Sequence, residues 1–306
     1  MMAPTLRAIS LQATNLTGTL RRCASTYATP THHQYQSANG AFVHFSTYGA
    51  ADAAASIVLL HGAPGSYADF KYLSPLLARE YLNVVAFDLP GNGRSSVNVV
   101  GGKYGLSDQT LAAAVVAALN GRPRTTPSFI LGHSFGSHTA IRVAASAKSV
   151  CGVALLAPVG FRPHHVLRRF PILQLGRFLQ RPHPLRSVLA KVNRWYYIHG
   201  LGFPQRVPED DFTYALQRIG SADFERIQEV ATSLHALNLP SFVALARDDA
   251  LIEPEIIREL GHLLPPGVRV EFPTGGHNIQ KTQAKPVADQ LVAWIESVLA
   301  QVPNTT

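Results

Sequence analysis

The stretch Gly132–His133–Ser134–Phe135–Gly136 decides the fold through what stands on either side of it. An apolar run at 129–131 precedes it and is typical of a short buried strand, while 135–147 follows with helical spacing. The pattern G-x-S-x-G between a strand and a helix holds its serine in a tight turn and lifts the hydroxyl clear of the backbone. Ser134 is therefore the first candidate for a nucleophile.

Outward from this turn, short apolar runs alternate with segments of helical spacing. We expect a helix capped by Ser107 over 110–120, a helix over 67–80, and a hairpin whose strands flank a two-residue turn at Asn39–Gly40. The alternation predicts a mostly parallel sheet with helices on both faces. The expected strands are 57–60, 84–87, 129–131, 153–156, 241–246 and 268–272, and the last helix is 287–299.

One long segment breaks this alternation. Residues 161–237 show helical spacing without an intervening strand, and we call them the lid segment. Its size and position are those of a helical lid inserted after a sheet strand. The sequence thus predicts an α/β core formed by 31–160 and 238–302, with the lid segment between its two parts.

Composition limits the classes of protein that need consideration. Of the 306 residues 46% are hydrophobic and 15% are charged, which provides for a substantial core. No apolar run approaches the roughly 18 residues of a membrane-spanning helix. The only two cysteines, Cys23 and Cys151, argue against a disulfide framework and favour a reducing or mitochondrial interior.

The first 30 residues have the composition of a targeting segment. They include Arg7, Arg21 and Arg22, many Ser and Thr, and no acidic residue. They also lack the compact apolar centre of a secretory signal, so they resemble a mitochondrial transit peptide. We therefore expect a mitochondrial protein, the alternative being a basic tail on a cytoplasmic one, and exclude residues 1–30 from the fold.

Five motifs in order carry a resemblance to a known family. They are HGAPG (61–65), DLPGNGRS (88–95), GHSFGS (132–137), ARDDALI (246–252) and GGHN (275–278). Together they resemble the α/β-hydrolase superfamily, specifically serine hydrolases with a helical lid, over about 41–299. The resemblance implies an α/β-hydrolase fold in which serine, acid and histidine follow one another along the chain.

The resemblance also implies roles for individual residues. Ser134 would be the nucleophile, His277 its base and Asp249 the acid that orients the histidine, with Asp248 as the competing acid. The main-chain N–H groups of Phe135 and Ala63 would form the oxyanion hole, because Pro64 has no N–H.

The lid segment combines cations with large apolar side chains. Residues 162–206 carry nine Lys/Arg, and no acidic residue occurs anywhere between 109 and 208. An aromatic lid favours an acyl or aromatic substrate, so we expect Trp195, Tyr196 and Tyr197 to line the substrate pocket. Three interpretations of the charge stay open: attraction of an anionic substrate group, peripheral contact with an anionic membrane, and a solvated face without a specific role.

The function that follows is hydrolysis of a carboxylic ester or related acyl bond through an acyl-enzyme at Ser134. Peptide- and carbon–carbon-cleaving relatives share such a triad, and a ligand-binding protein that keeps the fold with little turnover is the rival from another class. No nucleic-acid-binding motif accompanies the basic block, and the histidines of the lid segment lack metal-ligand spacing. We expect no metal and no cofactor, and a small acyl molecule as substrate.

Overall fold

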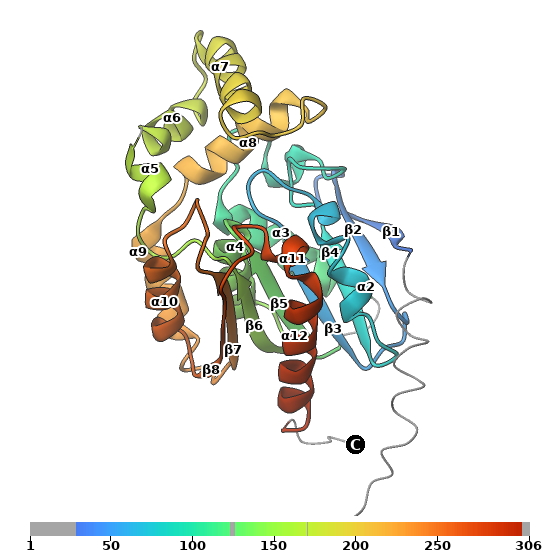
Figure 1. The fold of residues 1–306 in the computed structure, drawn as a ribbon. Coiled ribbons are helices and arrows are strands. Elements are labelled where there is room, and N and C mark those ends of the chain that lie inside the picture. Colours follow the sequence, from blue (N-terminus) through green and yellow to red (C-terminus); the bar gives the residue numbers. More distant parts are fainter. Residues whose placement is uncertain (1–28, 123–125, 170, 302–306) are drawn as a thin grey trace, which may run out of the picture.

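The computed structural model describes residues 29–122, 126–169 and 171–301 (Figure 1). Within them eight strands form one sheet in the order β1-β2-β4-β3-β5-β6-β7-β8. β1 and β2 pair antiparallel, as do β2 and β4, and every later pair is parallel. The strands are β1 Thr31–Gln36, β2 Phe42–Tyr48, β3 Ala55–Leu60, β4 Leu82–Phe87, β5 Ser128–His133, β6 Val150–Leu156, β7 Ser241–Ala246 and β8 Gly267–Phe272.

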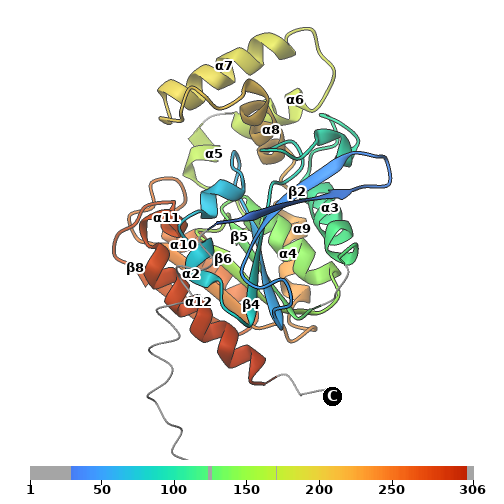
Figure 2. The ribbon, with the colours of Figure 1, turned by 90° about the vertical axis from the view of Figure 1, so that its right-hand side faces the viewer.

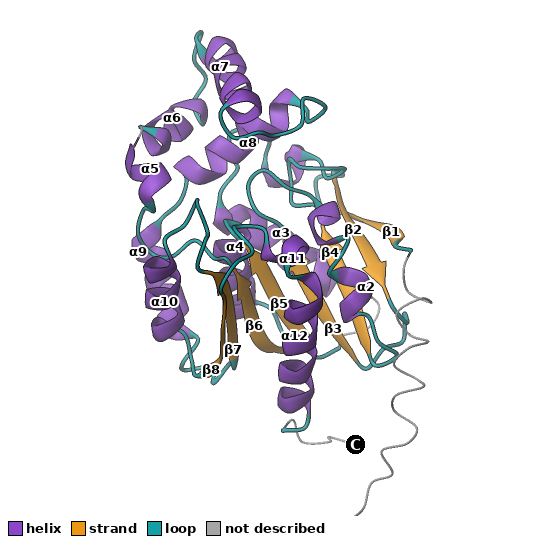
Figure 3. Ribbon diagram, in the orientation of Figure 1, coloured by secondary structure: helices purple, strands orange, loops and turns teal. Residues whose placement is uncertain are grey.

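Helices cover both faces of this sheet, as the sequence predicts (Figure 3). α3, α4, α9 and α10 share one apolar cluster with the sheet, while α2 and α12 pack on the other face. Strands β3, β4 and β7 are buried along their whole length, which explains why each is apolar at all but one position. The helices of these two layers are α2 Ser74–Leu77, α3 Asp108–Asn120, α4 Gly136–Ser146, α9 Phe224–Ser233, α10 Pro254–Leu263 and α12 Ala284–Leu299.

Several local predictions are confirmed, and two are wrong. Ser107 caps α3 by accepting from the N–H of Thr110, and β7 has the expected bounds. The expected helix over 67–80 is instead a 3-10 turn, η1 Tyr67–Phe70, and the short α2, whose early Pro75 has no N–H to continue a preceding helix. In the hairpin, Ser37 bonds to Ala41, so the connection is longer than two residues.

The lid segment contributes helices between β6 and β7. They are α5 His165–Arg169, α6 Ile172–Leu179, α7 Arg186–His199, α8 Glu209–Gly220 and α9. The first four lie beyond one edge of the sheet, and α7 is farthest from it (Figures 1 and 2). α9 instead packs on α4 within the core layers.

The parallel strands end at that same edge. Leu60 of β3 pairs with Gly132 of β5, and His133 of β5 pairs with Leu156 of β6. The loops after β3, β5, β7 and β8 therefore converge at the carboxyl edge, where open α/β sheets place their ligands. No described helix is long and apolar enough to cross a membrane. The expected targeting segment lies almost entirely outside the described residues.

Candidate active site

Ser134 stands in the sharp turn between β5 and α4. Its φ of 52° is a left-handed conformation that a residue with a side chain rarely adopts. A Cβ on Gly132 would lie 2.5 Å from the carbonyl oxygen of Gly136, and a Cβ on Gly136 would collide with the carbonyl of Leu60. Both glycines are thus required by close backbone approach, and the turn they permit sets Ser134 at the carboxyl edge of the sheet.

Ser134, His277 and Asp249 form a continuous hydrogen-bonded chain. Nε2 of His277 is 2.8 Å from Oγ of Ser134, and its Nδ1 is 2.8 Å from Oδ2 of Asp249. Because a carboxylate only accepts, Nδ1–H donates to Asp249 and leaves Nε2 free to accept the serine proton. The three residues come from the loops after β5, β7 and β8, and little of their surface is exposed: 11% of the His277 side chain and none of that of Asp249.

The two neighbouring aspartates have different partners. Oδ1 of Asp249 accepts from the N–H groups of Leu251 and Ile252 at 2.8 and 3.1 Å. Burial would raise the pKa of Asp249, but hydrogen bonds from His277 and these two N–H groups hold it below its ordinary value. Asp248 is exposed and accepts from the N–H groups of the GGHN glycines. Only Asp249 contacts the histidine ring.

The two expected oxyanion residues lie beside Ser134. Phe135 directly precedes α4, whose first N–H groups have no partner within the helix. Ala63 follows Gly62, on which a Cβ would come within 3.0 Å of Cβ of Ser134. No described residue accepts a hydrogen bond from the main-chain N–H of Ala63 or Phe135. Both donors therefore remain available next to the serine.

Two buried side chains, those of His61 and Arg218, hold the loop that carries Ala63. Nδ1–H of His61 donates to the carbonyl of Gly62 at 2.8 Å, and its Nε2 accepts from the N–H of Leu89. Burial and the nearby Arg218 lower the pKa of His61 to about 4, so it is neutral. Nη1 of Arg218 in α8 donates to the same Gly62 carbonyl at 3.0 Å. Sequence reasoning missed Arg218, because nothing local marks an arginine as buried.

Two further histidines lie close to the site and are also neutral. Nε2–H of His133 donates to the carbonyl of His277 at 3.0 Å, and burial lowers the pKa of His133 to about 3. The rings of Phe135 and His164 form a T-shaped contact with their centroids 6.3 Å apart, and burial lowers the pKa of His164 to about 4. Its buried Nδ1 has no partner among the described residues. Neither ring therefore places a positive charge against His277.

The pocket expected from Trp195, Tyr196 and Tyr197 is not formed as one unit, and this prediction needs correction. Trp195 is 62% exposed on the outer side of α7, whereas Tyr197 is buried against Phe212 of α8. Successive helical residues point about 100° apart, so three in a row cannot face one cavity. Of the three, only Tyr197 belongs to a buried cluster, and that cluster packs against Ala63.

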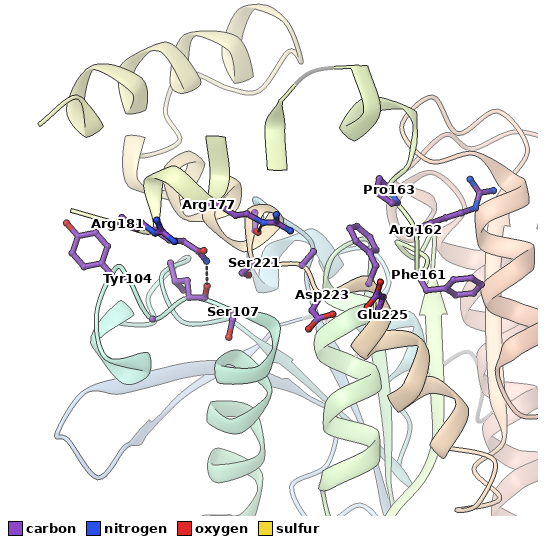
Figure 4. Close-up of a pocket in the computed structure, with 16 residues that line it drawn as sticks. Tyr104, Ser107, Phe161, Arg162, Pro163, Arg177, Arg181, Ser221, Asp223 and Glu225 are labelled. Atoms are coloured by element: carbon purple, nitrogen blue, oxygen red, sulfur yellow. Dashed lines mark hydrogen bonds between the residues drawn. The ribbon is translucent and has the colours of Figure 1, made fainter. Parts of the chain in front are cut away.

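A cavity lies between the lid helices and the core (Figure 4). It measures about 1040 Å³ and combines apolar walls from Phe161 and Phe224 with the cationic side chains of Arg177 on α6 and of Arg181, which follows that helix. Ser134 does not line it. A much smaller cavity, lined by Phe135 and Arg218, shares Ala222 with it. The two cavities thus meet at Ala222, and the smaller one reaches Phe135, the residue after Ser134.

Comparison with known proteins places the chain in a family. A stretch of 132 residues, 42% of the chain, is 33% identical to the dihydrolipoyllysine-residue acetyltransferase component of the acetoin cleaving system of Cupriavidus necator, and spans only 33% of that protein. Haloalkane dehalogenase DbeA from Bradyrhizobium elkani superposes with a TM-score of 0.67 over 90% of this chain and 100% of its own, at 17% identity. An esterase from Thermogutta terrifontis reaches 0.65 over 88% and 99%, at 19% identity.

These solved structures share the fold, and a family model matches a longer stretch of the sequence than the Cupriavidus necator relative does. The model of the alpha/beta hydrolase family covers residues 57–290, which include all five motifs and the three side chains of the hydrogen-bonded chain. The protein is a member of the alpha/beta hydrolase family.

Proposed function

We propose that the protein is a serine hydrolase that cleaves a carboxylic ester or a related acyl bond through an acyl-enzyme at Ser134. The observation that carries the proposal is the chain of two 2.8 Å contacts from Ser134 through His277 to Asp249. A serine hydroxyl is a weak nucleophile until a base within hydrogen-bond reach removes its proton. His277 occupies that position in the resting structure.

The proposed reaction has two halves. Oγ of Ser134 attacks the acyl carbon while its proton passes to Nε2 of His277, and Asp249 stabilises the imidazolium that results. The negative charge on the former carbonyl oxygen is held by the N–H groups of Ala63 and Phe135. Collapse of this intermediate breaks the acyl–oxygen bond, and His277 returns the proton to the departing alcohol. Water, activated by His277, then hydrolyses the acyl-enzyme.

The surroundings of Ser134 favour this reaction over the rivals. Within the superfamily that this chain resembles, dehalogenases and epoxide hydrolases use an aspartate at the nucleophile position, whereas this chain has Ser134. A protein that only binds a ligand needs neither a strained serine at φ 52° nor two free N–H donors beside it. Peptide- or carbon–carbon-bond cleavage would use the same groups, so the substrate assay must decide between these acyl chemistries.

A fluorophosphonate probe tests the proposal directly, because it reacts only with an activated serine. We expect the full chain to be labelled and Ser134→Ala to remain unlabelled. Ser137→Ala is the matched control, since it makes the same change three residues away, where the hydroxyl donates to the carbonyl of Val159. It should be labelled like the wild type. Folded wild-type protein that resists labelling would favour the binding-protein alternative.

Turnover of p-nitrophenyl esters with acyl chains of increasing length gives the second measurement. The kcat of the preferred ester should fall by about 10⁴-fold or more in Ser134→Ala, as expected when a nucleophile of this kind is removed. Probe labelling without hydrolysis of any ester, together with cleavage of a peptide or carbon–carbon bond, would retain the serine mechanism and replace the substrate class.

A further inference from the structure

Helix α7 has two apolar faces, and only one of them is covered. Ala190, Asn193 and Tyr197 are buried where α7 packs on α8, and Nδ2–H of Asn193 donates to the carbonyl of Phe212 at 3.0 Å. An amphipathic helix on a protein surface normally turns a polar face to solvent opposite such a buried face. α7 departs from this rule.

The opposite face carries a row of exposed apolar side chains, which we call the α7 stripe. Leu185, Val188 and Val192 are each 56% exposed, and Trp195 is 62% exposed. Their spacing of three, four and three residues aligns them along one side of the helix. A contiguous apolar row of this kind on a protein surface marks a site of interaction. The α7 stripe therefore needs a partner with an apolar component.

The charge around the stripe indicates what else that partner carries. Lys191 on α7, with Arg181 before the helix and Arg206 after it, is exposed, and the whole segment 109–208 contains no acidic residue. A second copy of the chain would bring the same cations against these ones in a symmetric dimer, which opposes self-association. The partner must accept apolar side chains and offer negative charge.

The position of α7 fits a flat partner. It lies across the end of the molecule farthest from the sheet, so no part of the core projects past it (Figure 2). Tryptophan on an apolar row with flanking Lys and Arg is the composition of helices that lie in the interface of a lipid bilayer.

We propose that the α7 stripe docks the protein on the surface of an anionic membrane, with Trp195 in the interfacial region and the lid cations against the headgroups. This inference does not depend on the chemistry of Ser134. It does place the lid helices, which lie beyond the carboxyl edge of the sheet on the side of the site, at the lipid surface.

The chain provides its own reporter for a test. It has two tryptophans, and Trp294 is 4% exposed in the core, so a change of emission on adding vesicles reports on Trp195. With vesicles of 70% phosphatidylcholine and 30% phosphatidylserine, we expect a blue shift of the emission and quenching by brominated acyl chains. Trp195→Phe should abolish the spectral change while the protein still sediments with the vesicles. Pure phosphatidylcholine vesicles should bind at least tenfold more weakly.

A matched pair of double variants distinguishes binding through the α7 stripe from nonspecific hydrophobic adsorption to the vesicles. Val188→Ser with Val192→Ser should lower the partition coefficient at least tenfold, because it removes two apolar side chains from the α7 stripe. Both side chains are exposed, so folding is preserved. Tyr72→Ser with Leu237→Ser removes exposed apolar side chains elsewhere, at 54% and 52% exposure, and should bind like the wild type. Equal binding by both double variants would overturn the proposal. So would a dimer in solution that the stripe variant dissociates, with no binding to vesicles.

Discussion

At the scale of single residues, the pair Asp248 and Asp249 provides the sharpest test of the site. Asp249 accepts from Nδ1–H of His277, whereas Asp248 accepts only from main-chain groups of the glycine loop among the described residues. Asn in place of Asp249 would offer an N–H to His277 and favour the wrong tautomer of the ring. We expect kcat for ester hydrolysis to fall by about 10³- to 10⁴-fold in Asp249→Asn.

Asp248→Asn serves as the control for this substitution. It keeps one of the two acceptor oxygens that bond to the N–H groups of Gly275 and Gly276 and leaves the Asp249–His277 hydrogen bond in place, so kcat should change by less than about tenfold. Steady-state kinetics of both variants on one ester decide the assignment. A larger loss in Asp248→Asn than in Asp249→Asn would exchange their roles and show that the resting hydrogen bonds do not identify the acid.

The residues of the site were predictable where a motif fixed them and unpredictable where packing did. Ser134, His277 and Asp249 each follow a strand within a recognisable motif, and the structure brings the three together. Arg218 and Trp195 carry no such signal. Whether a side chain of α7 or α8 turns inward depends on which neighbour covers that face, and this is not encoded within the helix itself.

At the scale of elements, the contact between α8 and the loop after β3 deserves a test of its own. Arg218 reaches from α8 to the carbonyl of Gly62, directly before the expected oxyanion donor Ala63. Burial lowers the pKa of Arg218 to about 10, which still leaves it charged at neutral pH. We interpret Arg218 as a positioning residue that fixes the loop from the lid side.

Arg218→Met keeps most of the side-chain volume and removes the donor. We expect kcat to fall by about tenfold to hundredfold, because small displacements of a catalytic group have effects of that size, while KM stays nearly constant. The free energy of unfolding should change little, since losing a buried charge offsets the lost hydrogen bonds. Arg218→Lys should recover part of kcat by restoring one donor.

Arg194→Met is the comparison within the same lid helices. Arg194 also donates to main-chain carbonyls, those of Gln205 and Val207, but it does not contact the loop after β3. Equal losses of kcat in the Arg194 and Arg218 variants, or losses that follow the melting temperature, would assign Arg218 a purely structural role. Urea unfolding measured beside the kinetics makes this distinction.

Elements were predicted best where a single local signal sets them. The Ser107 cap and the buried strand β7 are examples, because each depends on residues adjacent in sequence. The expected helix over 67–80 failed since its apolar spacing continues through Pro75, where the backbone cannot. Helix α10 was not anticipated, although Pro254 stands at its first turn. Its apolar residues become meaningful only beside α9.

At the scale of the whole molecule, the alternation of apolar runs and helical segments was sufficient to predict a mostly parallel sheet covered on both faces. The arrangement of the lid helices could not be predicted in this way. The core alternation repeats a few rules of parallel packing. The lid segment follows none of them, and its charges leave several packings open. Which face of α7 is left uncovered therefore depends on how α7 packs on α8, and that packing leaves the α7 stripe exposed.

The number of buried neutral histidines also gives the whole molecule a pH dependence. His61, His133 and His164 all have pKa values lowered by burial, to about 4, 3 and 4. In the unfolded chain each returns to its ordinary value near 6.5. Between pH 6.5 and 4 the unfolded state therefore binds protons that the native state does not, so stability falls as the pH is lowered through this range.

His164 is the residue on which to test this, because its Nδ1 has no partner to lose among the described residues. A shift from 6.5 to about 4 corresponds to a loss of at most about 3 kcal/mol on acidification, since one pKa unit is about 1.4 kcal/mol. His164→Gln removes the group that binds a proton in the unfolded chain. The free energy of unfolding of this variant should therefore decline less steeply than that of the wild type between pH 6.5 and 4. His262→Gln, at an exposed position, should follow the wild-type slope. Urea unfolding at half-unit pH steps measures the slopes, and identical slopes for His164→Gln and the wild type would mean that His164 is protonated in the native state as readily as in the unfolded chain.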